Sequence, residues 1–438
     1  CNFTLREVYV MQIHVVQRGE TLYSIAREYN SSASIIAASN EIEDPNQLVV
    51  GQALVIPIIG SLYWVVPGDS LYSIANSFNV NYLLLARINN ISPDQPLLVG
   101  QRLYIPPRQR ERIEVNAYVE PRGGVVTPQL EQDVRRVSPN LTYLAPFSFQ
   151  IKRDGSLMSP PLNRFSQIAE LNGAVLMMVV TNIEEGQFSA ELGRLILTNE
   201  QLQDQLLNNI ILTARRLRFK DIHFDMEFLP PENREDYNNF LRKASERLRA
   251  EGFLMSTALA PKTSATQEGA WYEAHDYKVH GEVSDFVVLM TYEWGYSAGP
   301  PLPVSPIGPV RDVVNYALTE IPSNKIMLGQ NLYGYDWALP FIEGGEYARA
   351  ISPQEAIRIA WDHNATILYD LNAQAPYFNY TSADGKSHIV WFEDARSIQA
   401  KFDLIRELSL RGISYWRLGL DFPQNWLLLN DNFYIIKR

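Results

Sequence analysis

Residues 219–228, FKDIHFDMEF, combine the pattern of a buried strand with a concentration of ionisable side chains. Side chains of a strand alternate between two faces, so one face would be apolar. The other face would carry Asp221, His223, Asp225 and Glu227. Two neighbouring carboxyl groups on one face are suited to acid–base chemistry. An exposed edge strand with one wet face would alternate in the same way, so the rest of the chain must decide.

From residue 112 onward, apolar strand-like runs alternate with amphipathic helical stretches, which is typical of α/β folds with parallel strands. The predicted strands are 113–119, 141–149, 174–182, 221–228, 254–261, 286–294, 326–334 and 412–420. The predicted helices include 199–218, 232–250, 309–320 and 394–409. This alternation predicts a (β/α)8 TIM barrel. A doubly wound sheet is the alternative, although no glycine-rich phosphate loop opens a helix here.

A barrel of this kind explains the polar face of residues 219–228. The inward face of a barrel strand is packed, but its C-terminal end opens onto the mouth where active sites lie. Asp225 and Glu227 stand at the C-terminal end of the fourth predicted strand. We therefore expect both carboxyl groups to face the mouth of the barrel.

The N-terminal part of the chain is an internal repeat with a period of 49 residues. VVQRGETLYSIAREYN (15–30) aligns with WVVPGDSLYSIANSFN (64–79), and the pentapeptide LYSIA occurs in both. Each copy predicts a short strand, a helix capped by Thr21 or Ser70, a second helix and a closing strand. The two copies therefore predict two small β-α-α-β modules.

Both copies resemble the LysM module over their full length. That family binds N-acetylglucosamine-containing polymers in a shallow groove formed by two loops. The resemblance places the groove at Gly19, Thr21, Leu22, Asn40 and Ile42 in the first copy, and at Gly68, Ser70, Leu71, Asn89 and Ile91 in the second. The alternative is that these residues hold the module together, which applies above all to the two leucines. Two weak sites in tandem would act together through effective concentration.

The domain boundaries follow from the repeat and from a break in composition. PPRQRER (106–112) reads as a linker between the modules and the barrel. We expect modules at 11–58 and 62–107 and a catalytic barrel at 112–438. Met11 begins a stretch that resembles a natural start, so Cys1–Val10 is expected to be an extension or a remnant.

The barrel resembles glycoside hydrolase family 18, which contains chitinases and related N-acetylglucosaminidases. Asp225-Met226-Glu227 resembles the Asp-x-Glu end of the acidic motif of that family. LMTYEWG (289–295) resembles its Met-x-Tyr-Asp element, and GISYWRLG (412–419) resembles its eighth-strand tryptophan. With its two modules, the chain is similar over all but the first ten residues to SleL-type spore cortex-lytic N-acetylglucosaminidases.

The resemblance implies substrate-assisted hydrolysis, in which the 2-acetamido oxygen of the sugar attacks its own anomeric carbon. Glu227 would protonate the leaving oxygen, and Asp225 would orient the acetamide and stabilise the positive nitrogen. Tyr292 would hydrogen-bond the acetamide oxygen, Met290 would stand beside it in the same element, and Trp416 would form the floor of the pocket.

Three positions depart from the family pattern. His223 stands where the family usually has an aspartate, and Lys220 replaces another acidic residue, which puts a relay between two aspartates in doubt. His223 could instead donate a hydrogen bond that fixes Asp225, or it could be a core histidine with no role in rate. Glu293 takes the place of the usual aspartate after Tyr292.

Further candidates lie near the end of the chain. Gln330, Asn331 and Tyr333 end the seventh predicted strand and could bind sugar hydroxyls, with packing as the alternative. The long connection 335–410 contains the aromatic stretches 368–380 and 390–397. These could line a cleft or form a structural insertion.

Composition limits the class of partner. A formal net charge of −11 argues against nucleic acid and anionic membranes as partners, and no stretch approaches the length of a membrane span. The single cysteine excludes an internal disulfide framework, and the six histidines show no metal-ligand spacing, so we expect neither a metal nor a cofactor. The predicted partner is peptidoglycan or another N-acetylglucosamine-containing glycan, and the predicted state is a monomer.

Three functions compete. The first is hydrolysis of spore cortex peptidoglycan during germination, with the enzyme in the coat or cortex region of the spore, which the lack of a visible signal peptide favours. The second keeps the chemistry but acts on chitin or the vegetative wall. The third is a non-catalytic glycan-binding lectin, but such relatives typically lose the acid glutamate, and this chain keeps Glu227.

Overall fold

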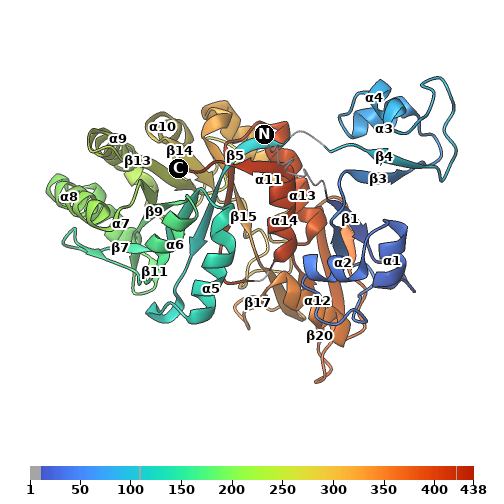
Figure 1. Cartoon of the computed structure of the whole chain (residues 1–438). Coiled ribbons are helices and arrows are strands. Elements are labelled where there is room, and N and C mark those ends of the chain that lie inside the picture. Colours follow the sequence, from blue (N-terminus) through green and yellow to red (C-terminus); the bar gives the residue numbers. More distant parts are fainter. Residues whose placement is uncertain (1–10, 108–109, 421) are drawn as a thin grey trace.

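The computed structural model describes residues 11–107, 110–420 and 422–438 (Figure 1). The expected extension Cys1–Val10 and part of the predicted linker, residues 108–109, lie outside the described residues. Among those residues, no helix combines the length and apolarity needed to cross a membrane.

The repeat forms two β-α-α-β modules, as predicted. The first module contains β1 (Gln12–Val15), α1 (Leu22–Glu28), α2 (Ala33–Ser39) and β2 (Ala53–Ile56). The second contains β3 (Ser61–Trp64), α3 (Leu71–Ser77), α4 (Tyr82–Ile88) and β4 (Arg102–Ile105). In each module the outer strands pair antiparallel. Thr21 and Ser70 cap α1 and α3 in capping boxes, which confirms both predicted helix starts.

The remainder is a closed barrel of eight parallel strands. Its strands, in chain order, are β5 (Glu111–Val119), β6 (Tyr143–Pro146), β9 (Val175–Thr181), β12 (Asp221–Asp225), β13 (Leu254–Leu259), β14 (Phe286–Leu289), β15 (Ile326–Asn331) and β21 (Gly412–Trp416). Pairing runs through all eight, and β12 pairs with both β9 and β13. The predicted barrel and its eight strands are confirmed, and the doubly wound alternative is wrong. Several strands end earlier than predicted because their last residues turn into the loops of the mouth.

Helices surround the barrel (Figure 1). They are α5 (Pro128–Val137), α6 (Phe165–Leu171), α7 (Ala190–Leu197), α8 (Glu200–Leu217), α9 (Arg234–Ala250), α10 (Tyr277–Val283), α11 (Ile307–Glu320), α13 (Ala395–Glu407) and α14 (Pro423–Asn432). Short strands accompany them: β7 (Phe149–Ile151), β8 (Leu157–Met158), β10 (Ile183–Glu184), β11 (Gln187–Phe188) and β22 (Phe433–Ile435). Their apolar faces pack against outward-facing barrel residues in one large core, which includes Ile222, Phe224 and Met226. The exposed-edge interpretation of residues 219–228 is therefore wrong.

The long connection after β15 is a folded insertion, defined here as residues 334–391. It contains β16 (Gly334–Leu339), β17 (Arg349–Ile351), α12 (Pro353–Asp362), β18 (Leu368–Asp370), β19 (Ala375–Thr381) and β20 (Ser387–Trp391). Its five strands form one antiparallel sheet in the order β17-β16-β20-β19-β18. The aromatic stretches thus belong to a small structural insertion, which was one of their two predicted roles.

The first module packs on the barrel and on the insertion, whereas the second projects away from the barrel (Figure 1). Ala53 and Val55 on β2 belong to the main barrel core, and Val49 belongs to the core of the insertion. The Ile367 N–H donates to the Val50 carbonyl at 2.9 Å. The first module is therefore docked on the barrel and the insertion, because its β2 carries apolar residues on both faces.

Candidate active site

Asp225 and Glu227 leave β12 at the mouth of the barrel. The strand ends at Asp225, and Phe228 adopts a positive φ of 53°, so Glu227 stands on a turn rather than on the strand as predicted. Both side chains are largely buried, with 5% of Asp225 and 9% of Glu227 exposed. The structure thus brings the two carboxyl groups together in a site shielded from water.

Two side chains from neighbouring loops hold the backbone of this turn. The Asn182 side chain, just after β9, accepts from the Glu227 N–H at 3.0 Å and donates to the Glu227 carbonyl at 2.9 Å. His275 accepts from the Ala260 N–H at 2.9 Å through Nδ1, so its Nε2–H donates to the Met226 carbonyl at 3.0 Å. Burial lowers the pKa of His275 to about 4, which keeps this ring neutral, and its two hydrogen bonds fix the tautomer.

Burial raises the pKa of both carboxyl groups, and the effect is larger for Glu227. Burial raises the pKa of Glu227 well above its usual range, and the neighbouring Asp225 raises it further. Burial also raises the pKa of Asp225, whose Oδ1 has no hydrogen-bond partner among the described residues. A buried acid kept protonated near neutral pH is what general-acid catalysis requires.

Trp271 covers Glu227 from the loop between β13 and α10. Its indole N–H donates to Glu227 Oε2, and its ring stacks on Phe228 with 6.2 Å between centroids and 12° between planes. This hydrogen bond stabilises the ionised carboxylate, so it lowers the pKa of Glu227 and opposes the effect of burial.

His223 belongs to a buried hydrogen-bond chain beneath the two carboxyl groups. The Ser256 hydroxyl donates to Asp221 Oδ1 at 2.6 Å, so its oxygen accepts from His223 Nδ1 at 2.7 Å. His223 Nε2 then accepts from the Tyr118 hydroxyl at 2.8 Å. Burial lowers the pKa of His223 to about 3, so the ring is neutral. The suggested hydrogen bond from His223 to Asp225 is wrong, because both ring nitrogens have other partners.

An aromatic wall surrounds the carboxyl groups. Tyr292 and Met290 pack in one apolar cluster with Tyr333 and Trp416 at its edge. The Trp416 ring lies 5.4 Å from that of Tyr118. A side chain at Gly329 would place a Cβ 2.2 Å from the Leu289 carbonyl and 3.0 Å from the Tyr292 ring, so only glycine fits behind Tyr292. The structure thus collects the predicted Tyr292, Met290 and Trp416 in one pocket wall.

The other candidates near β15 are engaged with one another. The Tyr333 and Tyr335 hydroxyls both donate to Glu293, the second at 3.0 Å. Gln330 donates to the Asn331 side chain at 3.0 Å, and Asn331 donates to the Tyr333 carbonyl at 2.7 Å. Gln330 and Asn331 are fully buried, so their side chains support the wall.

The predicted LysM groove residues divide into two groups. Gly19 and Gly68 form turns with φ of 87° and 92°, next to the capping residues Thr21 and Ser70. Leu22 and Leu71 are buried in the module cores, against which Ile42 and Ile91 pack. Leu22 and Leu71 are therefore core residues, as the structural alternative held.

The two asparagines of the predicted groove are also structural. Both N–H donors of Asn40 go to the carbonyls of Ile36 and Val55, and Asn89 does the same with Leu85 and Tyr104. Their side-chain oxygens accept from the backbone of the closing strands. These side chains therefore tie the second helix of each module to its closing strand, and the placement of the groove at Asn40 and Asn89 stays a prediction.

Asn182, His275, Trp271 and Tyr118 were not found from the sequence. Asn182 ends a predicted strand, so the rule that polar residues at C-terminal strand ends face the mouth could have found it. His275 and Trp271 lie in a loop without periodicity, where no sequence pattern indicates them. Among the described residues, no cluster of three or more His, Cys, Asp or Glu could hold a metal ion.

Comparison with known proteins places this geometry in a family. The model of the glycosyl hydrolases family 18 matches residues 124–421, and that of the LysM domain matches residues 14–57 and 63–106. The chain belongs to glycosyl hydrolase family 18. It is a family 18 glycosidase with two LysM domains, as the sequence predicted.

Three relatives are similar to this chain over 98% of its length. It is 63% identical to the cortical fragment-lytic enzyme of Bacillus subtilis (strain 168), over 98% of this chain and 99% of the relative. The crystal structure of the Bacillus megaterium QM B1551 spore cortex-lytic enzyme SleL matches with a TM-score of 0.89 and 54% identity, over 98% of this chain and 100% of the other. The Bacillus cereus SleL structure matches with a TM-score of 0.91 and 48% identity, over 98% and 99% of the two chains.

Proposed function

We propose that this family 18 glycosidase cleaves N-acetylglucosaminyl bonds in spore cortex peptidoglycan during germination, with retention of configuration. The observation that carries the proposal is the buried Glu227, whose raised pKa keeps it protonated beside Asp225 at the barrel mouth. The full-length similarity to cortical fragment-lytic enzymes supports the choice of substrate.

In the first step, the acetamido oxygen of the sugar attacks the anomeric carbon and the bond to the leaving sugar breaks. Glu227 gives its proton to the leaving oxygen, so the enzyme supplies an acid and the substrate supplies the nucleophile. In the second step, Glu227 as a carboxylate takes a proton from water, which attacks the anomeric carbon and opens the oxazolinium ring. Two attacks from opposite sides leave the configuration retained.

Asp225 and Tyr292 are the groups that would hold the acetamide. Asp225 Oδ1 has no partner among the described residues, so it is free to accept from the acetamide N–H. As a carboxylate, Asp225 would also stabilise the positive charge of the oxazolinium ion. Tyr292 stands in the aromatic wall beside it, and Trp416 offers the apolar surface that the acetamide methyl group needs.

The LysM modules would hold the enzyme on the insoluble polymer. They supply no group to the site around Glu227, so their contribution is retention rather than chemistry. The exposed turns at Gly19 and Gly68 are the groove positions that remain open to a glycan.

Mass analysis of products released from purified spore cortex tests this function. We expect fragments with N-acetylglucosamine at the new reducing end, and NMR of early product should show retained configuration. N-acetylmuramic acid at the new reducing end, or inversion, would contradict the proposal. Efficient hydrolysis of chitin with no action on cortex would instead support the alternative that this enzyme is a chitinase.

A further inference from the structure

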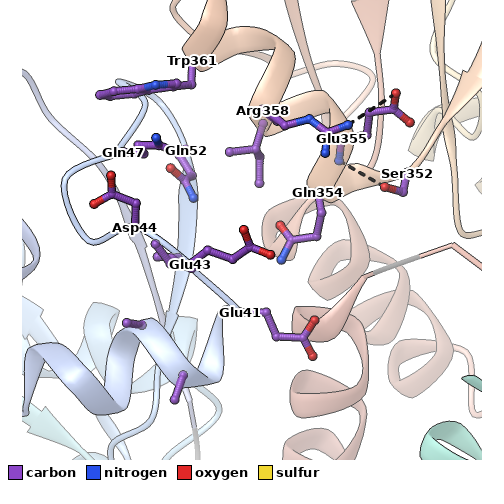
Figure 2. A pocket seen from close by; sticks show the side chains of 14 residues that line it. Glu41, Glu43, Asp44, Gln47, Gln52, Ser352, Gln354, Glu355, Arg358 and Trp361 are labelled. Atoms are coloured by element: carbon purple, nitrogen blue, oxygen red, sulfur yellow. Dashed lines mark hydrogen bonds and ion pairs between the residues drawn. The ribbon is translucent and has the colours of Figure 1, made fainter. Parts of the chain in front are cut away.

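A polar cavity of about 630 Å³ lies between the first module and α12 of the insertion (Figure 2). One wall is the loop that follows α2, and the other is the exposed side of α12. The size lies within the range of about 300–1,000 Å³ that small-molecule sites occupy. Of the predicted LysM groove residues only Ile42 lines this cavity, so the cavity adjoins that groove but extends from it onto α12 of the insertion.

The walls of the cavity are held in place by contacts between the two domains. Val49 of the module packs with Ile351 and Ile367 of the insertion in one apolar cluster. Gln354 Nε2 donates to the Asn40 carbonyl at 2.9 Å, and the Ile367 N–H donates to the Val50 carbonyl. At Gly51 a Cβ would lie 1.8 Å from the Ile367 carbonyl oxygen, so the backbones meet in direct contact there. A cavity with fixed walls can bind a ligand without first ordering them.

An aromatic ring and amide groups converge on this cavity. Trp361, at the end of α12, is 36% exposed and lies on the same side as Gln47 and Gln52 of the module (Figure 2). Gln52 is buried, and its side-chain oxygen accepts a hydrogen bond from the Val49 N–H. Its amide hydrogens remain available to a ligand in the cavity. A flat indole face beside amide donors is the combination that takes a pyranose ring, with its C–H face on the indole and its hydroxyls on the amides.

The charge of the lining selects among sugars. Glu41, Glu43, Asp44 and Glu355 line the cavity together with the guanidinium of Arg358. Arg136 pairs with Glu41 at 3.0 Å and Arg349 pairs with Glu355, so Glu43 and Asp44 are the lining carboxylates that have no ion pair among the described residues. Glu43 makes no hydrogen bond or ion pair with the described residues, and it points toward Gln354 across the cavity (Figure 2). Carboxylates accept well from sugar hydroxyls but repel anions. This lining therefore disfavours sugars that carry carboxylates or acidic peptides.

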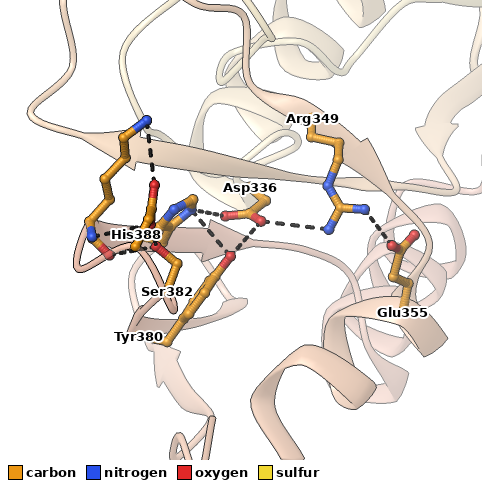
Figure 3. Close-up of polar contacts among 8 residues, drawn as sticks. Asp336, Arg349, Glu355, Tyr380, Ser382 and His388 are labelled. Carbon is orange, nitrogen blue, oxygen red and sulfur yellow. Dashed lines mark hydrogen bonds and ion pairs between the residues drawn. The ribbon is translucent and has the colours of Figure 1, made fainter. Parts of the chain in front are cut away.

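A polar network in the insertion sheet fixes Glu355 in this lining (Figure 3). Arg349 bonds Glu355 at 2.6 Å and lies 3.7 Å from Asp336. Asp336 in turn contacts His388 and the Tyr380 hydroxyl, each at 2.8 Å. Because Arg349 is shared between two carboxylates, Glu355 keeps acceptor capacity while its position is set by the sheet.

We propose that this cavity is a second glycan site, which binds an uncharged, peptide-free stretch of N-acetylated glycan on the indole of Trp361. The ligand class rests on the proposed function. The site would hold the polymer at the junction of module and insertion, in addition to the LysM grooves.

The test follows the indole signal of Trp361 in the full chain. We would record ¹H–¹⁵N spectra of the Glu227→Gln variant, which should not consume the probe, and assign the signal by its loss in Glu227→Gln/Trp361→Phe. During titration with the neutral tetrasaccharide of N-acetylglucosamine, we expect this signal and the Gln52 side-chain amide signals to shift. Trp361→Ala in the same background should weaken binding, followed at Gln52, by about three- to tenfold, from the usual worth of an aromatic contact.

Leu171→Ala, which truncates an 80% exposed side chain on α6, is the matched control and should leave the titration unchanged. A peptide-bearing disaccharide with free carboxylates should not shift the Trp361 signal, and an equal shift would overturn the proposed selectivity. Unchanged Trp361 and Gln52 signals, with shifts at Gly19 or Gly68, would overturn the second site and leave the proposed function intact. A chain that neither binds the tetrasaccharide nor cleaves cortex would overturn both.

Discussion

At the scale of single residues, the proposed chemistry depends on the protonation of Glu227. Replacing Glu227 by glutamine keeps the shape of the side chain but removes the proton that it can donate. We expect Glu227→Gln to lower kcat by about 10²–10⁴, the usual size of an acid–base contribution, with the fold and glycan binding intact. Rates on soluble cortex fragments, with circular dichroism as the control for folding, provide the measurement. Activity within a few-fold of the parent protein would remove Glu227 from this role.

Two neighbours of Glu227 shift its pKa in opposite directions, which gives a paired prediction on pH dependence. Asp225 raises the pKa of Glu227, so Asp225→Asn should lower it and move the basic limb of the kcat/KM profile to lower pH. The hydrogen bond from Trp271 lowers that pKa, so Trp271→Phe should move the same limb to higher pH. The basic limb reports loss of the active, protonated acid, and residual rates from pH 4 to 9 would locate it.

The opposite signs provide an internal control for this pair. Phenylalanine keeps a ring to stack on Phe228 but cannot donate, so a change in packing alone should leave the limb in place. Shifts of the same sign in both variants would mean that another group controls the limb.

At the scale of elements, the residue after β9 holds the turn after β12 that carries Glu227. Asn182 makes two hydrogen bonds to the backbone of Glu227, so Asn182→Ala would free the turn that carries the acid. We expect kcat to fall at least tenfold with little change in KM, and stability to fall by about 1–3 kcal/mol, from buried backbone groups left unpaired. Steady-state kinetics and urea unfolding measure the two effects. A rise in KM at constant kcat would assign Asn182 to substrate binding instead.

The elements themselves were largely predictable from periodicity, and the contacts at their ends were not. The alternation of Ile222, Phe224 and Met226 with polar residues predicts a strand that helices cover on one face. In a barrel, the C-terminal end of that strand then places Asp225 and Glu227 at the mouth. The turn after Asp225 depends on Asn182 and His275, which lie 43 residues before and 50 residues after it in the sequence. No local pattern encodes a hydrogen bond over such a separation. The partners of His223 escaped prediction for the same reason.

At the scale of the whole molecule, the two copies of the repeat differ where one of them docks. Ala53 and Val55 on β2 face the barrel core, whereas the equivalent positions on β4 are Arg102 and Tyr104. This difference was visible in the sequence, because a strand with apolar residues on both faces must be covered on both. The sequence analysis nevertheless treated β2 and β4 as equivalent, because the two copies are so similar.

The equivalent residues of the second copy supply a test of this docking. We expect Ala53→Arg with Val55→Tyr to release the first module from the barrel and to lower the unfolding temperature by several degrees, because a buried apolar contact is lost and a charge would be buried. Calorimetry and limited proteolysis are the measurements. Leu98→Ala in the second module, where the side chain is 73% exposed, is the control and should change neither. An unchanged unfolding temperature in the double variant would contradict the importance of this contact.

The docked first module also gives the enzyme a ruler. Because the first module is fixed relative to the barrel mouth, a glycan strand bound by both, as proposed, would be cut at a constant number of sugars from the point where it is held. Early products from long strands should therefore cluster around a preferred length, which mass spectrometry can measure. Releasing the module should broaden the distribution of product lengths without lowering the rate at which short fragments are cut.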